Sequence, residues 1–209
     1  MAEDVDSYHS ALIASALARL GDRLHVSDCE VANIHERAII DLHLTDIVRI
    51  PRHLTDRLVN SGLAGVYIGA GSVIELDNLR FLDEVHPVGW RPTATYADVP
   101  ALYDRNQKYI VAGTTMSNAV VRRDVLHEYG HALGRLIGLN TASELRERHA
   151  DANYWMTLPP YVRGQYAGDE GGRRELLAEL FRDRILNRND AISRWGLRLT
   201  AWLDQELRL

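Results

Sequence analysis

The five-residue run HEYGH, at positions 127–131, constrains this chain more strongly than any other stretch of its sequence. Residues four apart lie on one face of a helix, so His127 and His131 can direct two imidazole nitrogens at one point, as tetrahedral Zn²⁺ requires. Glu128 would lie beside these ligands without being one, where it can take a proton from water activated by the ion. The run predicts a metal-binding helix over 120–140; the alternative is a surface helix that carries two histidines by chance.

The composition is that of an ordinary globular protein, with 46% apolar and 25% charged residues in a chain of 209. A formal net charge of −5 suggests neither a nucleic-acid partner nor an anionic membrane surface. The single cysteine, Cys29, excludes an intramolecular disulfide and a multi-cysteine metal site. No apolar run reaches about 18 residues, so no membrane span is expected. The acidic start of the sequence shows no secretory signal.

The sequence contains no internal repeat, no low-complexity segment and no linker that would divide it. The glycine-rich segment 164–172 joins two helices that are expected to meet at one metal ion. A single domain over 1–209 is therefore predicted. An N-terminal helical extension at 1–60 and a closing helix at 190–209 would lie at its two ends.

Capping and turn residues place the remaining elements. Asp6 or Ser7 can cap a first helix that ends at Gly21, and the apolar spacing in 190–209 predicts one closing helix that packs on the core. Positions 24–50 fit strand and helix equally well. Other predictions are a helix at 51–60, strands at 65–69 and 109–113, a helical turn at 76–82, an ordered loop at 86–100, and a metal-helix cap at Ser117 or Asn118.

The strand at 109–113 comes shortly before the metal helix and could lie at the rim of an active-site cleft. If its edge is free, Ala112 and Gly113 can bind an extended peptide substrate by strand addition. If other strands flank it on both sides, it is an internal strand without that role. The sequence leaves both interpretations open.

A catalytic zinc site needs a third protein ligand, with the fourth position left to water. One class of zinc peptidases has a histidine three residues beyond a glycine that here is Gly134, but Ile137 occupies that position, so this class is excluded. Glu175 is the strongest remaining choice. It lies four residues before Glu179 on one face of an amphipathic helix, where Glu175 can bind the ion and Glu179 can accept the other N–H of a ligand histidine.

Two alternatives to this assignment of Glu175 remain. Glu175 can be a solvated residue of an ordinary amphipathic helix, or His149 or Asp151 can reach the ion on a returning loop, although both are expected at the exposed end of a helix. A separate signal favours the Glu175 helix. Gly130, inside the metal helix, costs about 1 kcal/mol relative to alanine, so we expect the backbone of the Glu175 helix to approach closely there.

Five segments of the chain carry a family resemblance: GVYIGAGSVIELDNLRFL, GWRPTATYADVP, YIVAG, VLHEYGHAL and ELLAELFRD. Together they resemble the peptidase domain of the anthrax lethal factor family, which includes the Pro-Pro endopeptidases. The resemblance covers roughly 62–190. It implies an α+β, zincin-like fold with a small mixed sheet, an active-site helix, a third-ligand helix, and extra helices at both ends of the chain.

The resemblance also implies roles for individual residues. His127, His131 and Glu175 would bind one Zn²⁺ per chain, and Glu128 would be the general base. In the family, a tyrosine on the loop before the third ligand donates a hydrogen bond to the oxyanion.

That tyrosine departs from the family pattern in this sequence, because the family's spacing lands on Gly168. Tyr166 is the nearest tyrosine and is predicted to be the oxyanion donor. Tyr161 is the second choice.

The function implied is that of a zinc-dependent endopeptidase that acts on a protein or peptide substrate, as a secreted or toxin-type effector. Because the sequence shows no secretory signal, an intracellular regulatory metalloprotease that acts on one partner protein is an alternative. A binding module in which zinc only joins two helices is another. Glu128 favours an enzyme, since a purely structural site has no use for that carboxylate. Compartment and oligomeric state stay open.

Overall fold

The computed structural model describes residues 2–27, 32–76, 82, 95–114 and 123–209, with only the backbone described for 2–6. The chain divides into two compact units, Met1–Val125 and Leu126–Leu209, and each is described separately. The single domain over 1–209 stays a prediction. The predicted metal ligands all belong to the second unit.

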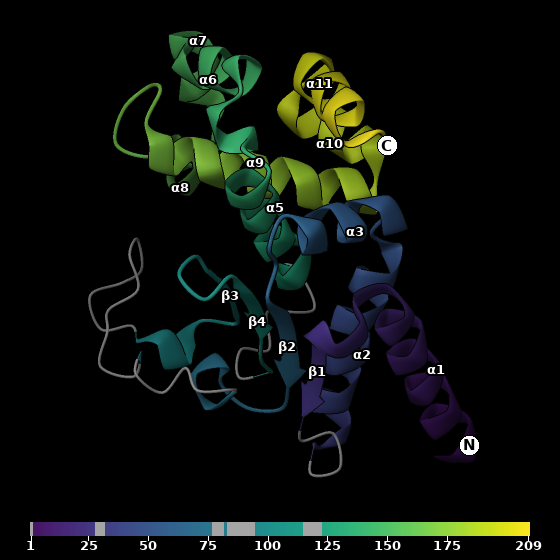
Figure 1. Cartoon of the computed structure of the whole chain (residues 1–209). Helices are drawn as coiled ribbons and strands as arrows, with labels where there is room; N and C mark the ends of the chain where they lie inside the picture. Colours follow the sequence, from purple (N-terminus) through teal and green to yellow (C-terminus); the bar gives the residue numbers. More distant parts are fainter. Residues whose placement is uncertain (1, 28–31, 77–81, 83–94, 115–122) are drawn as a thin grey trace. The chain divides into compact units, whose positions relative to one another are not determined.

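Three helices of the first unit pack together: α1 (Ala2–Leu20) lies against both α2 (Ile34–Arg49) and α3 (Arg52–Asn60) (Figure 1). Helix α1 begins at Ala2, so Asp6 and Ser7 lie inside it and their predicted capping role is wrong. Its predicted end is confirmed at Gly21, which opens a short 3₁₀ turn with a φ of +59°. The helix predicted at 51–60 is confirmed as α3.

The ambiguous segment 24–50 contains both a strand and a helix, β1 (Leu24–Ser27) and α2. Asn33 starts α2 because its side chain accepts hydrogen bonds from the backbone N–H groups of His35 and Glu36. The Glu36 carboxylate in turn accepts from the backbone N–H of Asn33. This reciprocal cap satisfies N–H groups that a helix start otherwise leaves unpaired.

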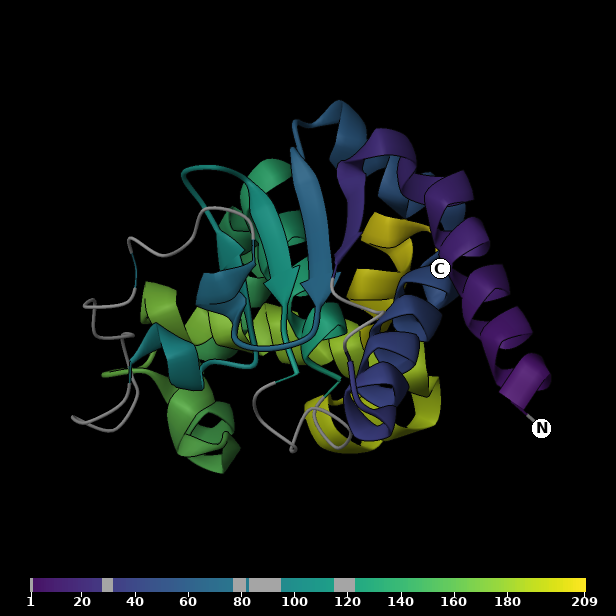
Figure 2. The ribbon, with the colours of Figure 1, turned by 90° about the horizontal axis from the view of Figure 1, so that it is seen from below.

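The described part of the first unit also contains a four-stranded sheet (Figures 1 and 2). Its strand order is β1, β2 (Gly65–Gly69), β4 (Tyr109–Ala112) and β3 (Ala101–Asp104). Strands β1, β2 and β4 are parallel, and β3 is antiparallel to β4. The strands predicted at 65–69 and 109–113 are confirmed, the second one residue shorter than expected.

Strand β4 is internal, which decides between the two interpretations left open for Ala112 and Gly113 and excludes the free edge. Ala112 pairs with Ile68 of β2 on one side and with Ala101 of β3 on the other. The backbone groups of Gly113 are also engaged, because its N–H donates to Pro100 and its carbonyl lies 3.4 Å from Nε2 of His43. The backbone groups of these two residues are already paired, so a substrate strand cannot be added there.

A cluster of apolar residues around β2 and β4 forms part of the core of the first unit. The short 3₁₀ helices η2 (Val73–Glu75) and η4 (Tyr96–Asp98) lie beside each other at this cluster. Its buried members are Tyr67, Val73, Ile74, Leu76, Val99, Leu102 and Val111. Several predictions fall outside the described residues: the helical turn over 77–81, the loop over 86–94, the cap at Ser117 or Asn118, and Cys29.

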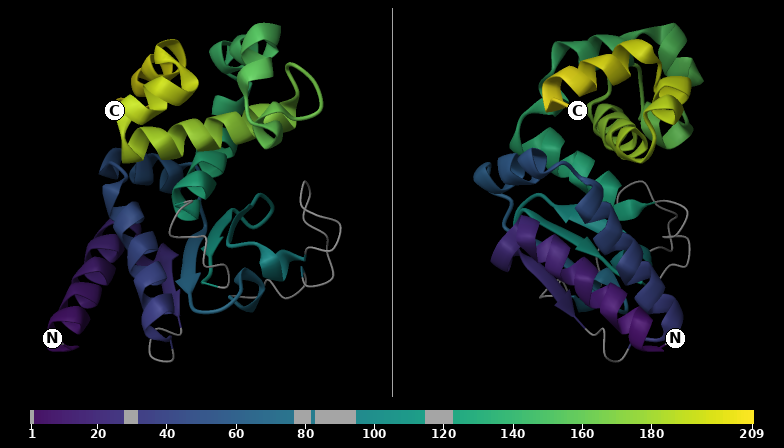
Figure 3. Two further views of the ribbon diagram at one scale, coloured as in Figure 1. Left: turned by 180° about the vertical axis from the view of Figure 1, so that it is seen from behind. Right: turned by 90° about the vertical axis from the view of Figure 1, so that its right-hand side faces the viewer.

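The second unit is helical. The helix that carries the HEYGH run, α5 (Asp124–Leu136), leads into this unit, and its longest helix is α9 (Glu170–Leu186). Figure 3 shows shorter helices gathered along α9, and α6, α8 and α10 contact it directly. The short helices are η5 (Leu139–Thr141), α6 (Ser143–Ala150), α7 (Ala152–Thr157), α8 (Pro160–Arg163), α10 (Arg188–Trp195) and α11 (Leu197–Leu207).

The single closing helix predicted for 190–209 is wrong. Gly196, with a φ of +90°, separates α10 from α11, and an ordinary residue adopts that backbone conformation only with strain. The predicted packing role is confirmed, because Trp195, Leu199 and Leu203 are all buried. Among the described helices, none has the length and apolar character needed to cross a bilayer.

Candidate metal centre

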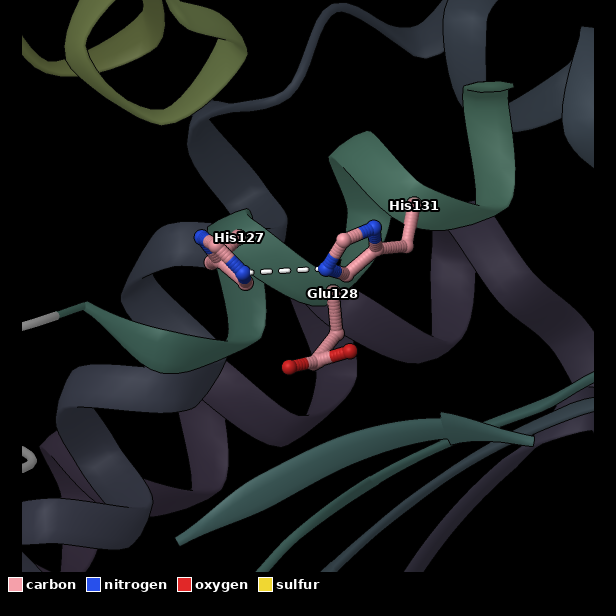
Figure 4. Close-up of side chains that lie close together, drawn as sticks. All are labelled: His127, Glu128 and His131. Carbon is pink, nitrogen blue, oxygen red and sulfur yellow. Dashed lines mark hydrogen bonds between the residues drawn. The ribbon is translucent and has the colours of Figure 1, made fainter. Parts of the chain in front are cut away.

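The two histidines of the HEYGH run meet on one face of α5. The Nε2 atoms of His127 and His131 lie 3.0 Å apart, and Figure 4 shows the two imidazole rings turned toward each other. Both side chains are mostly buried, with 16% and 19% of their surface exposed. The i,i+4 spacing therefore places two nitrogen donors at one point, with limited access from solvent.

Glu175, near the N-terminal end of α9, completes a group of three. Its Oε2 atom lies 3.3 Å from Nε2 of His127, and its Oε1 atom lies 3.4 Å from Nε2 of His131. Four ligands placed tetrahedrally at about 2.0–2.1 Å from one zinc ion are about 3.3 Å from each other. Two imidazole nitrogens and a carboxylate fit that ion in chemical type. Their separations of 3.0, 3.3 and 3.4 Å are close to that value, with a different oxygen of Glu175 facing each histidine.

Glu128 lies alongside the two histidines (Figure 4). One carboxylate oxygen of Glu128 and one nitrogen of each ring all lie within 4.8 Å of one another. The residue is 9% exposed, so its carboxylate is largely withdrawn from bulk solvent. Its position beside the histidine pair is the one that the sequence predicted for it.

Gly130 lets α5 and α9 approach each other. A Cβ atom on Gly130 would lie only 2.5 Å from the Cα atom of Ala178 in α9, closer than any real pair of such atoms. The predicted approach of the Glu175 helix is confirmed. This contact is backbone against backbone, and it brings the Glu175 side chain, one turn earlier on α9, within reach of the histidines.

Glu179 orients the first of the two histidines. Its Oε1 atom lies 3.0 Å from Nδ1 of His127, on the opposite side of the ring from Glu175. A carboxylate accepts hydrogen bonds only, so Nδ1 carries the proton and the lone pair of the neutral ring is on Nε2. That tautomer is the one in which His127 can bind a metal through Nε2.

The charges around the histidine pair favour a cation between them. Burial alone would lower the pKa of His127, but hydrogen bonds to Glu175 and Glu179 and the charge of Glu128 raise it to about 10. Burial, together with the charge on His127, lowers the pKa of His131 to about 4. Without a metal ion, these opposite shifts favour a protonated His127 beside a neutral His131. A divalent cation would replace that proton among the same carboxylates.

The two tyrosines considered for the oxyanion have different surroundings. The Tyr166 side chain is 62% exposed, on the loop before α9. The Tyr161 hydroxyl, from α8, donates a hydrogen bond of 3.0 Å to Oε2 of Glu179. The structure therefore connects Tyr161, the second choice from the sequence, to the carboxylate that holds His127. Spacing along the chain favoured Tyr166 and gave no signal for this contact.

The rival ligands, His149 and Asp151, have other roles. His149 is fully buried, so its predicted place at an exposed helix end is wrong. Its Nε2–H donates to the carbonyl of Val162 at 3.0 Å, and its Nδ1 accepts from the backbone N–H of Gly168 at 3.1 Å. The Asp151 side chain caps α7 by accepting from two backbone N–H groups. Both side chains are engaged with the backbone, which leaves neither as a competitor for Glu175.

Comparison with known proteins gives a likeness in fold. No protein-family model matches the sequence, and no curated protein matches it either. Among solved structures, the chain is similar to a Pro-Pro endopeptidase, PPEP-2, from Paenibacillus alvei. The TM-score is 0.62 at 21% sequence identity, and the match covers 88% of this chain and 98% of that one. The mixed α+β fold, mainly helical with a small four-stranded sheet, is therefore shared with that structure.

Proposed function

We propose that this chain is a zinc-dependent endopeptidase. The observation that carries the proposal is the convergence of two imidazole nitrogens and one carboxylate, from His127, His131 and Glu175, at separations of 3.0–3.4 Å. Three protein ligands leave a tetrahedral ion one position for a reactant, which is typical of catalytic rather than structural zinc sites. A zinc ion held here would supply Lewis-acid activation of water and of a peptide carbonyl.

Glu128 is the general base in this proposal. Its buried carboxylate accepts a proton from the attacking water and later gives it to the leaving amine of the cleaved peptide bond. A carboxylate in this position adds nothing to a site that only joins two helices. Its presence beside the ligands supports hydrolysis over a purely structural role.

A tyrosine hydroxyl would donate to the oxyanion that forms when water adds to the carbonyl. Tyr166 was the first choice from the sequence. The Tyr161 hydroxyl instead donates to Glu179, on the Nδ1 side of His127 and away from Nε2, so Tyr166 stays the proposed donor.

The substrate class follows from the reaction and from the likeness in fold. Endopeptidases cleave internal peptide bonds, so the substrate would be a protein or an extended peptide. The similar structure is that of a Pro-Pro endopeptidase. Peptides with an internal Pro-Pro bond are therefore the first substrates to test, within a library that also contains other bonds.

The test compares the wild-type protein, Glu128→Gln and Glu170→Gln on that peptide library. Glu170 lies at the exposed start of α9, so Glu170→Gln makes the same chemical change away from the metal centre. We expect Glu128→Gln to bind zinc normally and to lose about 100-fold or more of the cleavage rate, in the range of general-base catalysis. Glu170→Gln should cleave at the wild-type rate. Equal cleavage by all three proteins would refute the proposed role of Glu128.

A further inference from the structure

Arg182, one turn beyond Glu179 on α9, forms two hydrogen bonds with the carboxylate that orients His127. Its two terminal nitrogens donate to the two oxygens of Glu179, at 2.8 Å to Oε1 and 2.7 Å to Oε2. The side chains are 13% and 4% exposed. This paired arrangement fixes the plane of the carboxylate as well as its position, which a single hydrogen bond would not do.

The orientation of Glu179 decides what His127 can do. Oε1 accepts from both His127 and Arg182, while Oε2 accepts from both Arg182 and Tyr161. All four hydrogen bonds are made only when Oε1 faces the imidazole. A carboxylate that rotated away would leave Nδ1 of His127 without its acceptor, and the ring would be free to turn Nε2 away from the metal position.

Arg182 is itself held in place. Its Nε and one terminal nitrogen donate to Oδ1 of Asp183 at 3.0 and 2.8 Å. The other oxygen of Asp183 accepts from the indole N–H of Trp195 at 2.8 Å, and Trp195 is 1% exposed. The carboxylate of Asp183 therefore links the guanidinium to Trp195, a core residue of α10. These hydrogen bonds restrict the movement of the Arg182 side chain.

We propose that Arg182 is a positioning residue for the metal centre: its guanidinium fixes Glu179 so that His127 presents Nε2 to the ion. This inference rests on the proposed function, since it needs the ion to be bound at His127, His131 and Glu175. The hydrogen bonds of Arg182 go to Glu179 and Asp183 and not to the three proposed ligands. It acts on metal affinity through Glu179.

The test measures zinc affinity by competition with a chromophoric chelator for the wild-type protein, Arg182→Met, Arg182→Lys and Arg184→Met. Loss of an outer partner of a metal ligand typically weakens metal binding about 10- to 100-fold. We expect Arg182→Met to fall in that range. Arg182→Lys keeps the charge beside two buried carboxylates but lacks the planar pair of donors, so we expect it to fold normally and still to bind zinc more weakly than the wild type.

Arg184→Met is the matched control. Arg184 lies on the same helix, is 17% exposed, and pairs with Asp204 of α11 instead of with a residue of the metal centre. Its loss should leave zinc affinity unchanged. The absorption spectrum of bound Co²⁺ adds a readout of ligand geometry, which should shift in both Arg182 variants and stay unchanged in Arg184→Met.

The outcomes separate this inference from the proposed function. Wild-type affinity in Arg182→Lys, or an equal loss in Arg184→Met, would overturn the positioning role. If Arg182→Met does not fold, Arg182→Lys decides the matter. A wild-type protein that binds no zinc would overturn the proposed function and the positioning role together.

Discussion

His149 and His127 are both withdrawn from solvent in the second unit, yet their nitrogens have different partners. Each ring nitrogen of His149 meets one backbone group of the opposite hydrogen-bonding character. His127 instead has carboxylates near both nitrogens and a second imidazole beside Nε2. Burial lowers the pKa of His149, whereas the carboxylates raise that of His127. A buried histidine whose two nitrogens are hydrogen-bonded to the backbone stabilises the fold. A histidine surrounded by carboxylates and by the nitrogen of a second imidazole is suited to bind a cation.

Replacement of His127 should give the largest effect. His127→Ala removes one of three protein ligands, and we expect zinc affinity to fall by more than about 100-fold, beyond the range seen for loss of outer partners. The metal-free variant should stay folded, because Glu179 keeps its hydrogen bonds to Arg182 and Tyr161. Zinc titration followed by thermal unfolding checks both parts. Unchanged zinc affinity would contradict the assignment of His127 as a ligand.

The pH dependence of zinc binding should separate His127 from an ordinary histidine. The pKa of His127 is raised to about 10, so zinc must displace a proton at every pH below that value. Affinity should therefore rise with pH, about tenfold per unit and about 100-fold between pH 6.5 and 8.5, with one proton released per ion. A histidine of ordinary pKa, near 6.5, would add almost no slope above pH 7, where the remaining slope would come from ionisation of zinc-bound water with a pKa of about 7.

Calorimetric titrations of zinc in two buffers with different protonation enthalpies would count the released proton directly. Zinc speciation in each buffer must be included in the analysis. An affinity that is flat from pH 7 to pH 9 would show that the carboxylates do not hold a proton on His127.

Replacement of His149 should lower the stability of the fold and leave zinc affinity unchanged, the reverse of what is expected for His127. His149→Ala leaves the carbonyl of Val162 without its partner, removes one of two acceptors of the Gly168 N–H, and creates a cavity. We expect unfolding to become easier by about 2–3 kcal/mol, roughly 30- to 150-fold in the folding equilibrium. Zinc affinity of the folded protein should not change. Chemical denaturation of the metal-free protein and zinc titration below the transition measure the two quantities, and a loss of zinc affinity without a loss of stability would reverse the comparison.

The parts of the site that could be predicted are those set by spacing along a helix. The i,i+4 pairs His127–His131 and Glu175–Glu179 each share a helix face, and the structure brings all four residues into one group. Gly130 indicated where a second helix would approach, because a helix keeps a glycine only at a cost. These signals are local, so they need no knowledge of how distant segments pair.

The predictions that were wrong or left open depend on contacts between distant segments or on the path of a loop. The flanking of β4 on both sides follows from its pairing with β2 and β3, which no local pattern in 109–113 encodes. His149 was expected to be exposed because its partners, Val162 of α8 and Gly168 of the loop before α9, come later in the chain and are not encoded near it. The hydrogen bond of Tyr161 to Glu179 depends in the same way on the packing of α8 against α9.

The smallest effect should distinguish the two tyrosines. Tyr161→Phe removes one of the four hydrogen bonds to Glu179, so the carboxylate stays oriented by Arg182 and His127. A hydrogen bond to a charged group contributes about 1.5–3 kcal/mol to stability, but its loss leaves Glu179 oriented. Zinc affinity should therefore fall no more than about tenfold, the lower end for loss of an outer partner. Tyr166→Phe, at a side chain 62% exposed, should leave zinc affinity unchanged. The zinc competition assay measures the contribution of the contact with Glu179, and the cleavage rate at equal zinc occupancy tests the role at the oxyanion. A larger loss of rate in Tyr161→Phe than in Tyr166→Phe would contradict the choice made from spacing.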